Sequence, residues 1–557
     1  MEATFESPIA SAAGTLARSR QGTIAAWRLG MIDVLLLVLA FSLVMHSRGS
    51  LLDDPGVGWH LRNIDAMWAE GGWLTTDPFS GPRANQQWLT NQWLGDLLLR
   101  FGWWWGGLEG IAAVTIATLL LMFRCLYGML RRDGLAPLPA TIWTAAGALG
   151  TSPAWLARPN IATVFFVMVT AWVLDRYHRG ECRRRDTLWL LPMFVVWANT
   201  HGGFVAGLVT LAAVWSVEAG LAMGLPRGDR RQTARQRLAH LSWLALAASL
   251  CTLINPYGWN LYAWVFKFLG NGFFTNLNLE WQSPDFHRAD AICFEPLILL
   301  LPLLIALSRR RPSLVALGLS VLWLHFALNG YRHVAPWVLV TVPLLGRLSV
   351  EVPWLRAMAA RLNPGGLSEF SLRVPRLACP TVSSALLGKP AVAPDLQGRD
   401  GQITKSRHRS DNRRGPAAGW AATAAICLVL LGGARWTEGF ASHDPKHIPT
   451  KALRYVIEHH DGRAVFHSVA WGGWLTWHGW PELKTYIDDR NEVQGRRHIV
   501  EYIGIINACA DWEEKLARHG VELVCIDVRA PLAPQLARCD DWRELYRDDF
   551  AVIFEAE

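Results

Sequence analysis

Residues 51–93 read LLDDPGVGWHLRNIDAMWAEGGWLTTDPFSGPRANQQWLTNQW and lie between the first two long apolar runs of the chain. The adjacent carboxylates Asp53 and Asp54 sit on a Pro/Gly turn just beyond the first run, and His60 follows soon after. Titratable side chains are costly beside an apolar segment, so each one there is a hypothesis for a functional site. We therefore interpret the rest of the chain around this stretch.

The composition favours a membrane protein. Of the 557 residues, 51% are hydrophobic and 18% are charged, whereas soluble domains usually carry about 25% charged residues. Tryptophan occurs 30 times, and indole rings favour the headgroup region of a bilayer. The run 31–44 lacks a small-residue cleavage site, which is typical of an uncleaved first span rather than a signal peptide.

Apolar runs predict eleven membrane spans, with the N-terminus inside and the C-terminus outside. Four short links predicted inside hold 15 Arg and four acids, which is the positive-inside pattern. Several runs are near the lower end of the roughly 17–25 residues that cross a bilayer. An interfacial helix is expected at 93–107, with Asp96 and Arg100 on one face. The spans are expected at about 27–46, 108–130, 138–152, 160–175, 187–200, 203–222, 240–256, 292–307, 313–328, 333–348 and 417–435.

The predicted fold class is mainly α: a polytopic transmembrane helix bundle with a small C-terminal α/β domain. Residues 437–557 carry 14 Lys/Arg and 21 Asp/Glu and are expected to be extracytoplasmic. Strand-like and helical patterns alternate there, as in an α/β domain, with strands expected at AVFHSV, KTYIDD, VELVCIDV and the closing LYRDDFAVIFEA. The predicted organisation is a cytoplasmic tail at 1–26, a transmembrane module at 27–348 with the outer loop 47–92, a basic, largely disordered cytoplasmic insert at 349–416, a last span at 417–436, and the α/β domain at 437–557.

Several classes of partner are not indicated. The net charge of +8 comes from short links between apolar runs, and no nucleic-acid-binding motif accompanies it. Neither a P-loop nor a GxGxxG motif is present, so a nucleotide is not indicated. The chain has nine cysteines, and none of them forms a CxxC motif. Cys509, Cys525 and Cys539 would permit one disulfide of undetermined pairing.

Polar residues gather at the loop boundaries predicted on the outer face. Each has a structural alternative: an acidic turn, an arginine that extends to the headgroups, or a solvated loop acid. Their shared location on one membrane face favours a functional site instead. The candidates are Asp53, Asp54, His60, Arg158, His201, Glu280, Asp285, Arg332 and His333.

The mixture of side chains indicates transfer chemistry. Asp53 or Asp54 fits a general base that takes the proton of an attacking hydroxyl. The arginines and histidines fit the neutralisation of a phosphate leaving group, and the other candidates fit substrate binding. The paired acids would also suit Mg²⁺ or Mn²⁺, which prefer oxygen ligands. The roles of base and metal ligand stay open.

An acidic pair in the first outer loop of such a scaffold resembles the GT-C superfamily of membrane glycosyltransferases. DDPGVGWHL, TDPFS, WLTNQWL, ARPN, WANTHGGF, INPYG, EWQSPDF, WGGWLTW and YIDDR are similar to segments of bacterial multi-pass proteins distantly similar to protein mannosyltransferases and lipid A aminoarabinose transferases. The resemblance covers most of the chain except 1–26 and 349–416. It implies a polyprenyl-phosphate sugar donor, inversion at the anomeric carbon, and action at the outer face of a bacterial inner membrane on a glycan, lipid or protein acceptor. The acidic pair is Asp-Asp here, where Asp-Glu is usual, so the identity of the base stays open.

Two other classes of protein fit parts of the pattern. A transporter or flippase of a lipid-linked saccharide would use the same Arg and His residues, but it would place its site near the membrane midplane. A non-catalytic membrane scaffold would use the outer domain to bind a partner. The collection of polar groups at one face favours the enzyme.

Overall fold

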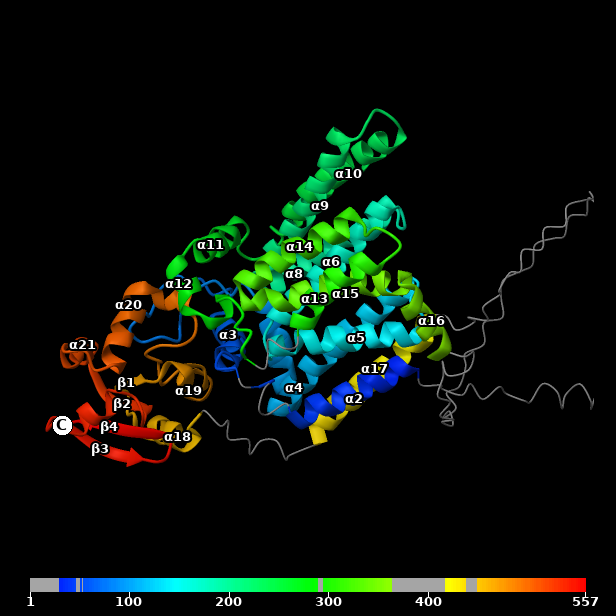
Figure 1. Ribbon diagram of the computed structural model, residues 1–557. Helices are drawn as coiled ribbons and strands as arrows, with labels where there is room; N and C mark the ends of the chain where they lie inside the picture. The colour runs from blue at the N-terminus through cyan, green and yellow to red at the C-terminus, as the bar shows by residue number, and fades with distance from the viewer. Residues whose placement is uncertain (1–29, 47–50, 53, 289–293, 363–415, 437–447) are drawn as a thin grey trace, which may run out of the picture.

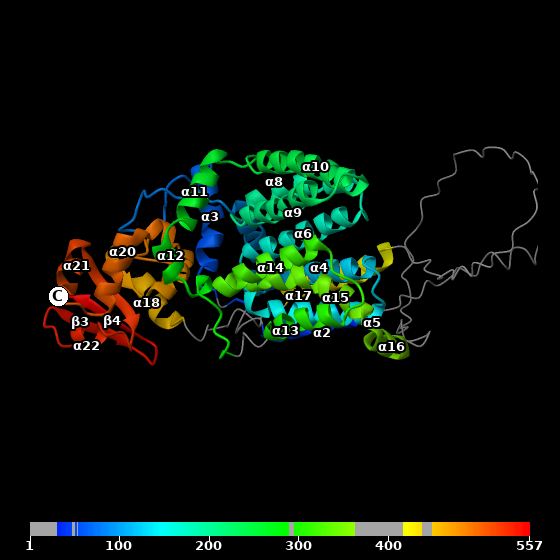
Figure 2. The ribbon, with the colours of Figure 1, turned by 45° about the horizontal axis from the view of Figure 1, so that its top comes forward.

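A computed structural model describes residues 30–46, 51–52, 54–288, 294–362, 416–436 and 448–557. They form a helical body and a smaller C-terminal part built on a four-stranded sheet (Figure 1, Figure 2). The prediction of a mainly helical fold with a small sheet is confirmed. The predicted tail 1–26, Asp53 and residues 363–415 of the predicted insert lie outside the described residues.

Most helices of the body follow the predicted apolar runs to within a few residues. An exception is α10 (Asp229–Cys251), which begins well before its apolar run because the basic link continues the helix. The others are α2 (Met31–His46), α4 (Trp93–Arg132), α5 (Pro137–Thr151), α6 (Asn160–Arg179), α8 (Leu190–Thr200), α9 (Phe204–Gly224), α13 (Glu295–Leu307), α14 (Leu314–Asn329), α15 (Val334–Glu351) and α17 (Pro416–Trp436).

Two helices lie outside the predicted runs: α7 (Arg184–Thr187), in a predicted inner link, and α16 (Pro353–Leu362), in the predicted insert. The expectation of disorder is wrong for 353–362, because PWLRAMAARL is rich in the strong helix formers Ala, Leu, Arg and Met.

Within the described residues, three helical segments are long and apolar enough to cross a membrane: Trp93–Arg132, Phe204–Gly224 and Tyr331–Glu351. Shorter apolar helices include Met31–Met45, Glu295–Leu307, Leu314–Asn329 and Trp420–Gly433. The number of spans and the inside–outside assignment remain predictions.

Helix α15 forms the centre of the helical body, and every residue from Val334 to Gly346 is buried. Near its end, Arg347 forms ion pairs with Asp133 at 2.8 Å and Asp175 at 3.0 Å. Those two acids belong to links or helix ends predicted on the inner side. The 3₁₀ turn η5 (Tyr331–His333) precedes the other end of α15. Polar residues of the predicted inner and outer faces therefore lie at opposite ends of one helix.

Helix α4 bends at Gly106 and Gly107, where the backbone leaves helical geometry and Gly107 has a φ of 61°. The bend separates the predicted interfacial helix from the following apolar run. Asp96 and Arg100, expected on one face of this helix, both contact the helix α3 (Val57–Glu70). Asp96 contacts His60, and Arg100 donates a hydrogen bond to Asp65.

The predicted outer loop contains a helix, α3 (Val57–Glu70), that the sequence analysis did not identify. Its apolar residues alternate with charged ones, and burial against neighbouring segments stabilises it. Helices α11 (Trp259–Leu269) and α12 (Gly272–Leu277) were also not predicted. In both ribbon views these helices lie between the body and the C-terminal part (Figure 1, Figure 2).

The C-terminal sheet has the strand order β1-β2-β4-β3. Strands β1 and β2 are parallel, whereas β4 is antiparallel to both of its neighbours. Helices surround the sheet (Figure 1). The strands are β1 (Ala464–His467), β2 (Val521–Asp527), β3 (Trp542–Arg547) and β4 (Ala551–Ala556), and the helices are α18 (Thr450–His459), α19 (Gly472–Gly479), α20 (Asn491–Ile506), α21 (Trp512–Arg518) and α22 (Ala533–Leu536).

The strand expected at KTYIDD is wrong. This segment pairs with the outer loop rather than with the sheet: Thr485 N–H donates to Phe79 O at 3.0 Å, and Gly81 N–H donates to Thr485 O at 2.9 Å. The closing segment forms the two strands β3 and β4, not one, because a turn at Asp548 reverses the chain.

Backbone contact between α3 and α19 joins the outer loop to the C-terminal part. A Cβ atom on Gly58 would lie 1.8 Å from the carbonyl oxygen of Gly473. A Cβ atom on Gly473 would lie 1.8 Å from the carbonyl oxygen of Pro55. Only glycine permits this approach, since no other residue lacks a Cβ atom.

Gly473→Ala should therefore destabilise the full chain, by about 1–3 kcal/mol as in other overpacked sites. Thermal unfolding of the detergent-solubilised protein measures the expected decrease in Tm. The matched control is Gly220→Ala on α9, where an added Cβ meets no atom within 4 Å. Equal Tm values for the two variants would contradict the close contact.

Candidate functional site

Asp54 and Arg158 form the centre of the candidate site. The Oδ1 atom of Asp54 accepts hydrogen bonds from Gly56 N–H at 2.8 Å and from Arg158 Nη2 at 2.7 Å. The Oδ2 atom accepts a bond from Arg158 Nε. Two parallel bonds from a guanidinium group to a carboxylate are a strong and directional arrangement. Both carboxylate oxygens of buried Asp54 are therefore occupied.

Two further carboxylates face Arg158. Glu280, in the 3₁₀ turn η3 (Leu279–Trp281), accepts a hydrogen bond from Nη1 at 2.7 Å. Asp489, just before α20, has its Oδ2 atom 3.7 Å from Nη2, and its Oδ1 atom accepts a bond from Trp59 Nε1 at 2.8 Å. One cation thus faces three carboxylates from distant segments of the chain, so acids are in excess.

The charges set the protonation of this cluster. Burial alone would lower the pKa of Arg158, but Asp54, Glu280 and Asp489 together raise it well above its ordinary value. Arg158 therefore stays protonated. Burial raises the pKa of Asp489, and the neighbouring charge of Asp54 raises it further, against the opposing effect of Arg158.

A cavity of about 610 Å³ adjoins the cluster. Its volume lies within the range of about 300–1,000 Å³ that is usual for small-molecule pockets. Glu280 and Asp489 line it, whereas Asp54 and Arg158 do not. Other polar groups in its wall include Asn91, His201, Arg332, His333, Arg490 and Glu492.

Arg332 supplies a cation to the cavity. Its guanidinium carbon lies 4.3 Å from the ring centroid of Trp281, in a cation–π contact. Within the part of the chain that the structure describes, Arg332 forms no ion pair. Its N–H groups therefore suit an anionic group in the cavity.

His201 is a neutral hydrogen-bond donor. Its Nδ1 atom accepts a bond from Gly203 N–H at 3.0 Å and lies 2.9 Å from the Thr163 hydroxyl. That arrangement assigns the ring proton to Nε2. Burial, together with nearby cations, lowers the pKa of His201 to about 3. His201 was predicted to neutralise a phosphate group with a positive charge. The structure instead supports an uncharged N–H donor.

His333 lies at the cavity wall and is surrounded by aromatic rings. Its ring centroid is 5.8 Å from that of Trp281, 6.2 Å from that of Trp323 and 5.7 Å from that of Phe326. The aromatic rings hold the imidazole in one orientation at the start of α15.

His60 does not reach the cavity. Its Nδ1 atom lies 2.6 Å from Asp96 Oδ1, and Asn63 donates to the other Asp96 oxygen at 2.9 Å. His60 and Asp96 are both buried and join α3 to α4. The ring of His60 stacks on that of Trp59, with the ring centroids 3.7 Å apart. His60 therefore supports the indole that contacts Asp489.

The predicted site residues are therefore only partly brought together. Asp285 is exposed, contacts His287 and does not line the cavity. Asp53 lies outside the described residues. The structure brings Asp54, Arg158 and Glu280 into one cluster and places His201, Arg332 and His333 around the adjoining cavity.

The sequence analysis assigned no role to Asp489 or Glu492, although both line the cavity. A signal for Asp489 was available, because YIDDR presents adjacent acids after an apolar pair, as Asp53 and Asp54 do. Nothing local marks Glu492. Burial raises its pKa to about 7, so it titrates near neutral pH.

A second, fully buried ion cluster holds this segment in place. Arg490 donates to Asp77 Oδ1 at 2.8 Å and to Asp488 Oδ2 at 2.9 Å, and all three side chains are inaccessible to solvent. Because buried charges are tolerated only when paired and hydrogen-bonded, each of these groups depends on the others. Asp77 belongs to the outer loop, so the cluster fixes Asp489 relative to α3.

A divalent cation at Asp54 does not fit this arrangement. Both oxygens of Asp54 are occupied by N–H donors, and Arg158 stands where a metal ion would approach. The expectation of Mg²⁺ or Mn²⁺ at Asp53 and Asp54 therefore gains no support from the described residues.

The comparison with solved structures shows the fold of the chain. The chain is similar to the archaeal oligosaccharyltransferase AglB from Archaeoglobus fulgidus, with a TM-score of 0.52 and 12% identity over 89% of this chain and 69% of that one. It is also similar to ArnT from Cupriavidus metallidurans, with a TM-score of 0.51 and 13% identity over 98% of both chains. Comparisons with protein-family models and with curated proteins give no match.

Glu492→Gln should change how stability depends on pH. Because the pKa of folded Glu492 is raised to about 7 from 4.5, the unfolded chain loses this proton first as pH rises. The wild type therefore loses stability between these values, and the variant does not. We expect the Tm of the variant, relative to wild type, to increase from pH 5 to pH 8.

Glu513→Gln, at an exposed position of α21, serves as the control, with a Tm difference that stays constant over this range. A pH-independent difference for Glu492→Gln would contradict the raised pKa.

Proposed function

We propose that this protein is an integral membrane glycosyltransferase that transfers a sugar from a polyprenyl-phosphate donor to an acceptor on the outer face of a bacterial inner membrane. The observation that carries the proposal is the cavity, with the carboxylates Glu280 and Asp489 at one part of its wall and Arg332, which forms no ion pair with the described residues, at another. The AglB structure, which contains a dolichol-phosphate, supports a lipid-phosphate donor. The identities of the sugar and the acceptor are not part of the proposal.

The reaction requires a base and an anion site. An acceptor hydroxyl attacks the anomeric carbon, its proton passes to a carboxylate, and the bond from that carbon to the phosphate oxygen breaks. The polyprenyl phosphate leaves with the electron pair. In-line displacement of this kind inverts the anomeric centre, as the resemblance to GT-C enzymes implies.

Asp489 is the described carboxylate that best suits the base. It lines the cavity, and its Oδ2 atom accepts no hydrogen bond at normal length from the described residues, since Arg158 Nη2 lies 3.7 Å away. Burial raises its pKa towards neutrality, which improves a carboxylate as a base. Asp54, with both oxygens bound, positions Arg158. Asp53 was the other predicted base, and the activity test below includes it together with Asp54 and Asp489.

Arg332 and His201 suit the leaving group. Arg332 offers a fork of N–H donors on a cavity wall, and guanidinium groups match phosphate geometry. His201 adds the neutral Nε2–H donor. Preorganised donors of this kind stabilise charge that develops on the leaving oxygen.

The activity test compares membranes that express the wild type, Asp53→Asn, Asp54→Asn and Asp489→Asn. Each is supplied with a panel of labelled polyprenyl-phosphate sugars, and release of free polyprenyl phosphate is followed. Loss of the general base should lower kcat by about 10²–10⁴-fold. We expect this loss for Asp489→Asn, and a smaller loss for Asp54→Asn through misplacement of Arg158.

Asp540→Asn, at an exposed position beyond α22, is the control and should match the wild type. Release without transfer to an acceptor would indicate hydrolysis. Movement of an intact lipid-linked saccharide across the membrane, with no release, would instead favour the flippase, and the absence of both would favour a non-catalytic scaffold.

The proposed location predicts that the C-terminus is extracytoplasmic. A C-terminal alkaline phosphatase fusion, which is active only outside the cytoplasm, should therefore be active. The same fusion after residue 311, in a link predicted inside, should be inactive. The reverse pattern would contradict the topology while leaving the geometry of the cavity unchanged.

A further inference from the structure

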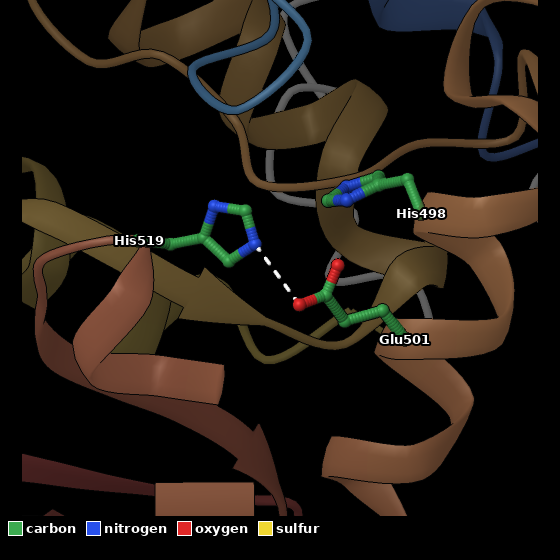
Figure 3. Close-up of side chains that lie close together, drawn as sticks. All are labelled: His498, Glu501 and His519. Carbon is green, nitrogen blue, oxygen red and sulfur yellow. Dashed lines mark ion pairs between the residues drawn. The ribbon is translucent and has the colours of Figure 1, made fainter. Parts of the chain in front are cut away.

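Two histidines and a glutamate converge in the C-terminal part (Figure 3), and none of the three lines the cavity. His498 and Glu501 lie one helical turn apart on α20, and His519 follows α21. One ligand atom from each lies within 4.8 Å of the others. Figure 3 shows the three side chains pointing toward one another.

The hydrogen bonds prepare these groups to bind a metal ion. His498 Nε2 lies 2.9 Å from Tyr486 O, so it donates its proton there and leaves the lone pair on Nδ1. A backbone carbonyl that fixes the tautomer in this way is the usual outer partner of a metal-bound histidine. His519 Nε2 is buried, makes no hydrogen bond with the residues that the structure describes, and lies 3.4 Å from Glu501 Oε1.

A second observation comes from Tyr486, which is 2% exposed. Its hydroxyl is buried without a hydrogen-bond partner among the described residues. Its ring contacts both imidazoles, at centroid distances of 5.0 Å to His498 and 5.5 Å to His519. Among the described residues, two polar atoms of rings in contact, Tyr486 Oη and His519 Nε2, are thus buried without a hydrogen bond, which is unusual unless a ligand satisfies them.

The donor set indicates the ion. Two imidazole nitrogens and one carboxylate oxygen form the His₂Glu set that zinc uses while a fourth position stays open. With bonds of about 2.0–2.1 Å, tetrahedral ligand atoms lie about 3.4 Å apart, as His519 and Glu501 already do. Arg518 also donates to Glu501 at 3.0 Å, but it is half exposed and paired with Glu514, so it can withdraw.

We propose that His498, Glu501 and His519 form a zinc site that fixes α20 to the connection between α21 and β2. The site goes beyond the proposed glycosyl transfer and does not depend on it. The site would also affect the cavity, because Glu492, which lines the cavity, lies in the first turn of α20. Gly495, with a φ of 71°, interrupts the helix between Glu492 and His498, so the bound ion would hold the segment beyond this bend.

The test uses the full chain in detergent, stripped with a chelator and titrated with ZnCl₂. Calorimetry should show one zinc ion bound per wild-type chain, and Tm should rise with zinc concentration, because a ligand of the native state stabilises it. His519→Gln should weaken binding by at least about tenfold and abolish the rise in Tm. His519→Cys should retain both, because a thiolate is a zinc ligand.

His459→Gln, at an exposed position of α18, is the matched control and should behave as the wild type. Two results would overturn the site: no zinc-dependent rise in Tm for the wild type, or unchanged binding in His519→Gln, which would locate the zinc elsewhere. Neither measurement requires glycosyl transfer, so failure here and failure of the proposed function remain distinguishable.

Discussion

One partly buried guanidinium group, that of Arg158, determines how the site is assembled. Its N–H groups contact acids from the turn before α3, from η3 and from the segment before α20. The side chain of Asp54 is fully buried, and breaking a buried ion pair costs about 3–5 kcal/mol. The contacts of Arg158 therefore hold three distant segments together.

The C-terminal part is integral to this arrangement. Its sheet is a separate layer, but Asp489 and Arg490, in the segment between α19 and α20, belong to the cavity wall. Arg490 pairs with Asp77 of the outer loop, and the glycine backbones of α3 and α19 touch. Charge pairing and steric fit thus act at the same junction, so the two parts form one functional unit.

Much of the helical body could be predicted because long apolar runs set helix positions regardless of tertiary context. Helix α3 was missed because its stability comes from packing of an amphipathic segment, and the strand expected at 484–489 was wrong because backbone pairing with Phe79 and Gly81 outweighs strand propensity.

The same distinction applies to the site. Asp54, Arg158 and Glu280 were predictable, since ends of spans on one face meet in space. The roles of Asp489, and of His60 paired with buried Asp96, were not, because they depend on contacts between elements that linear order does not specify.

The hydrogen bond from Trp59 to Asp489 joins residues 430 positions apart, and this separation has a consequence for biosynthesis. At about 5–20 residues per second, roughly 20–90 seconds of translation separate the two. During that interval the emerging outer loop lacks Asp489 and Arg490, so Asp77 keeps its bonds from Phe79 N–H and Ser80 N–H but lacks its cationic partner. The contacts of the outer loop are therefore completed only after residues 488–490 have been made.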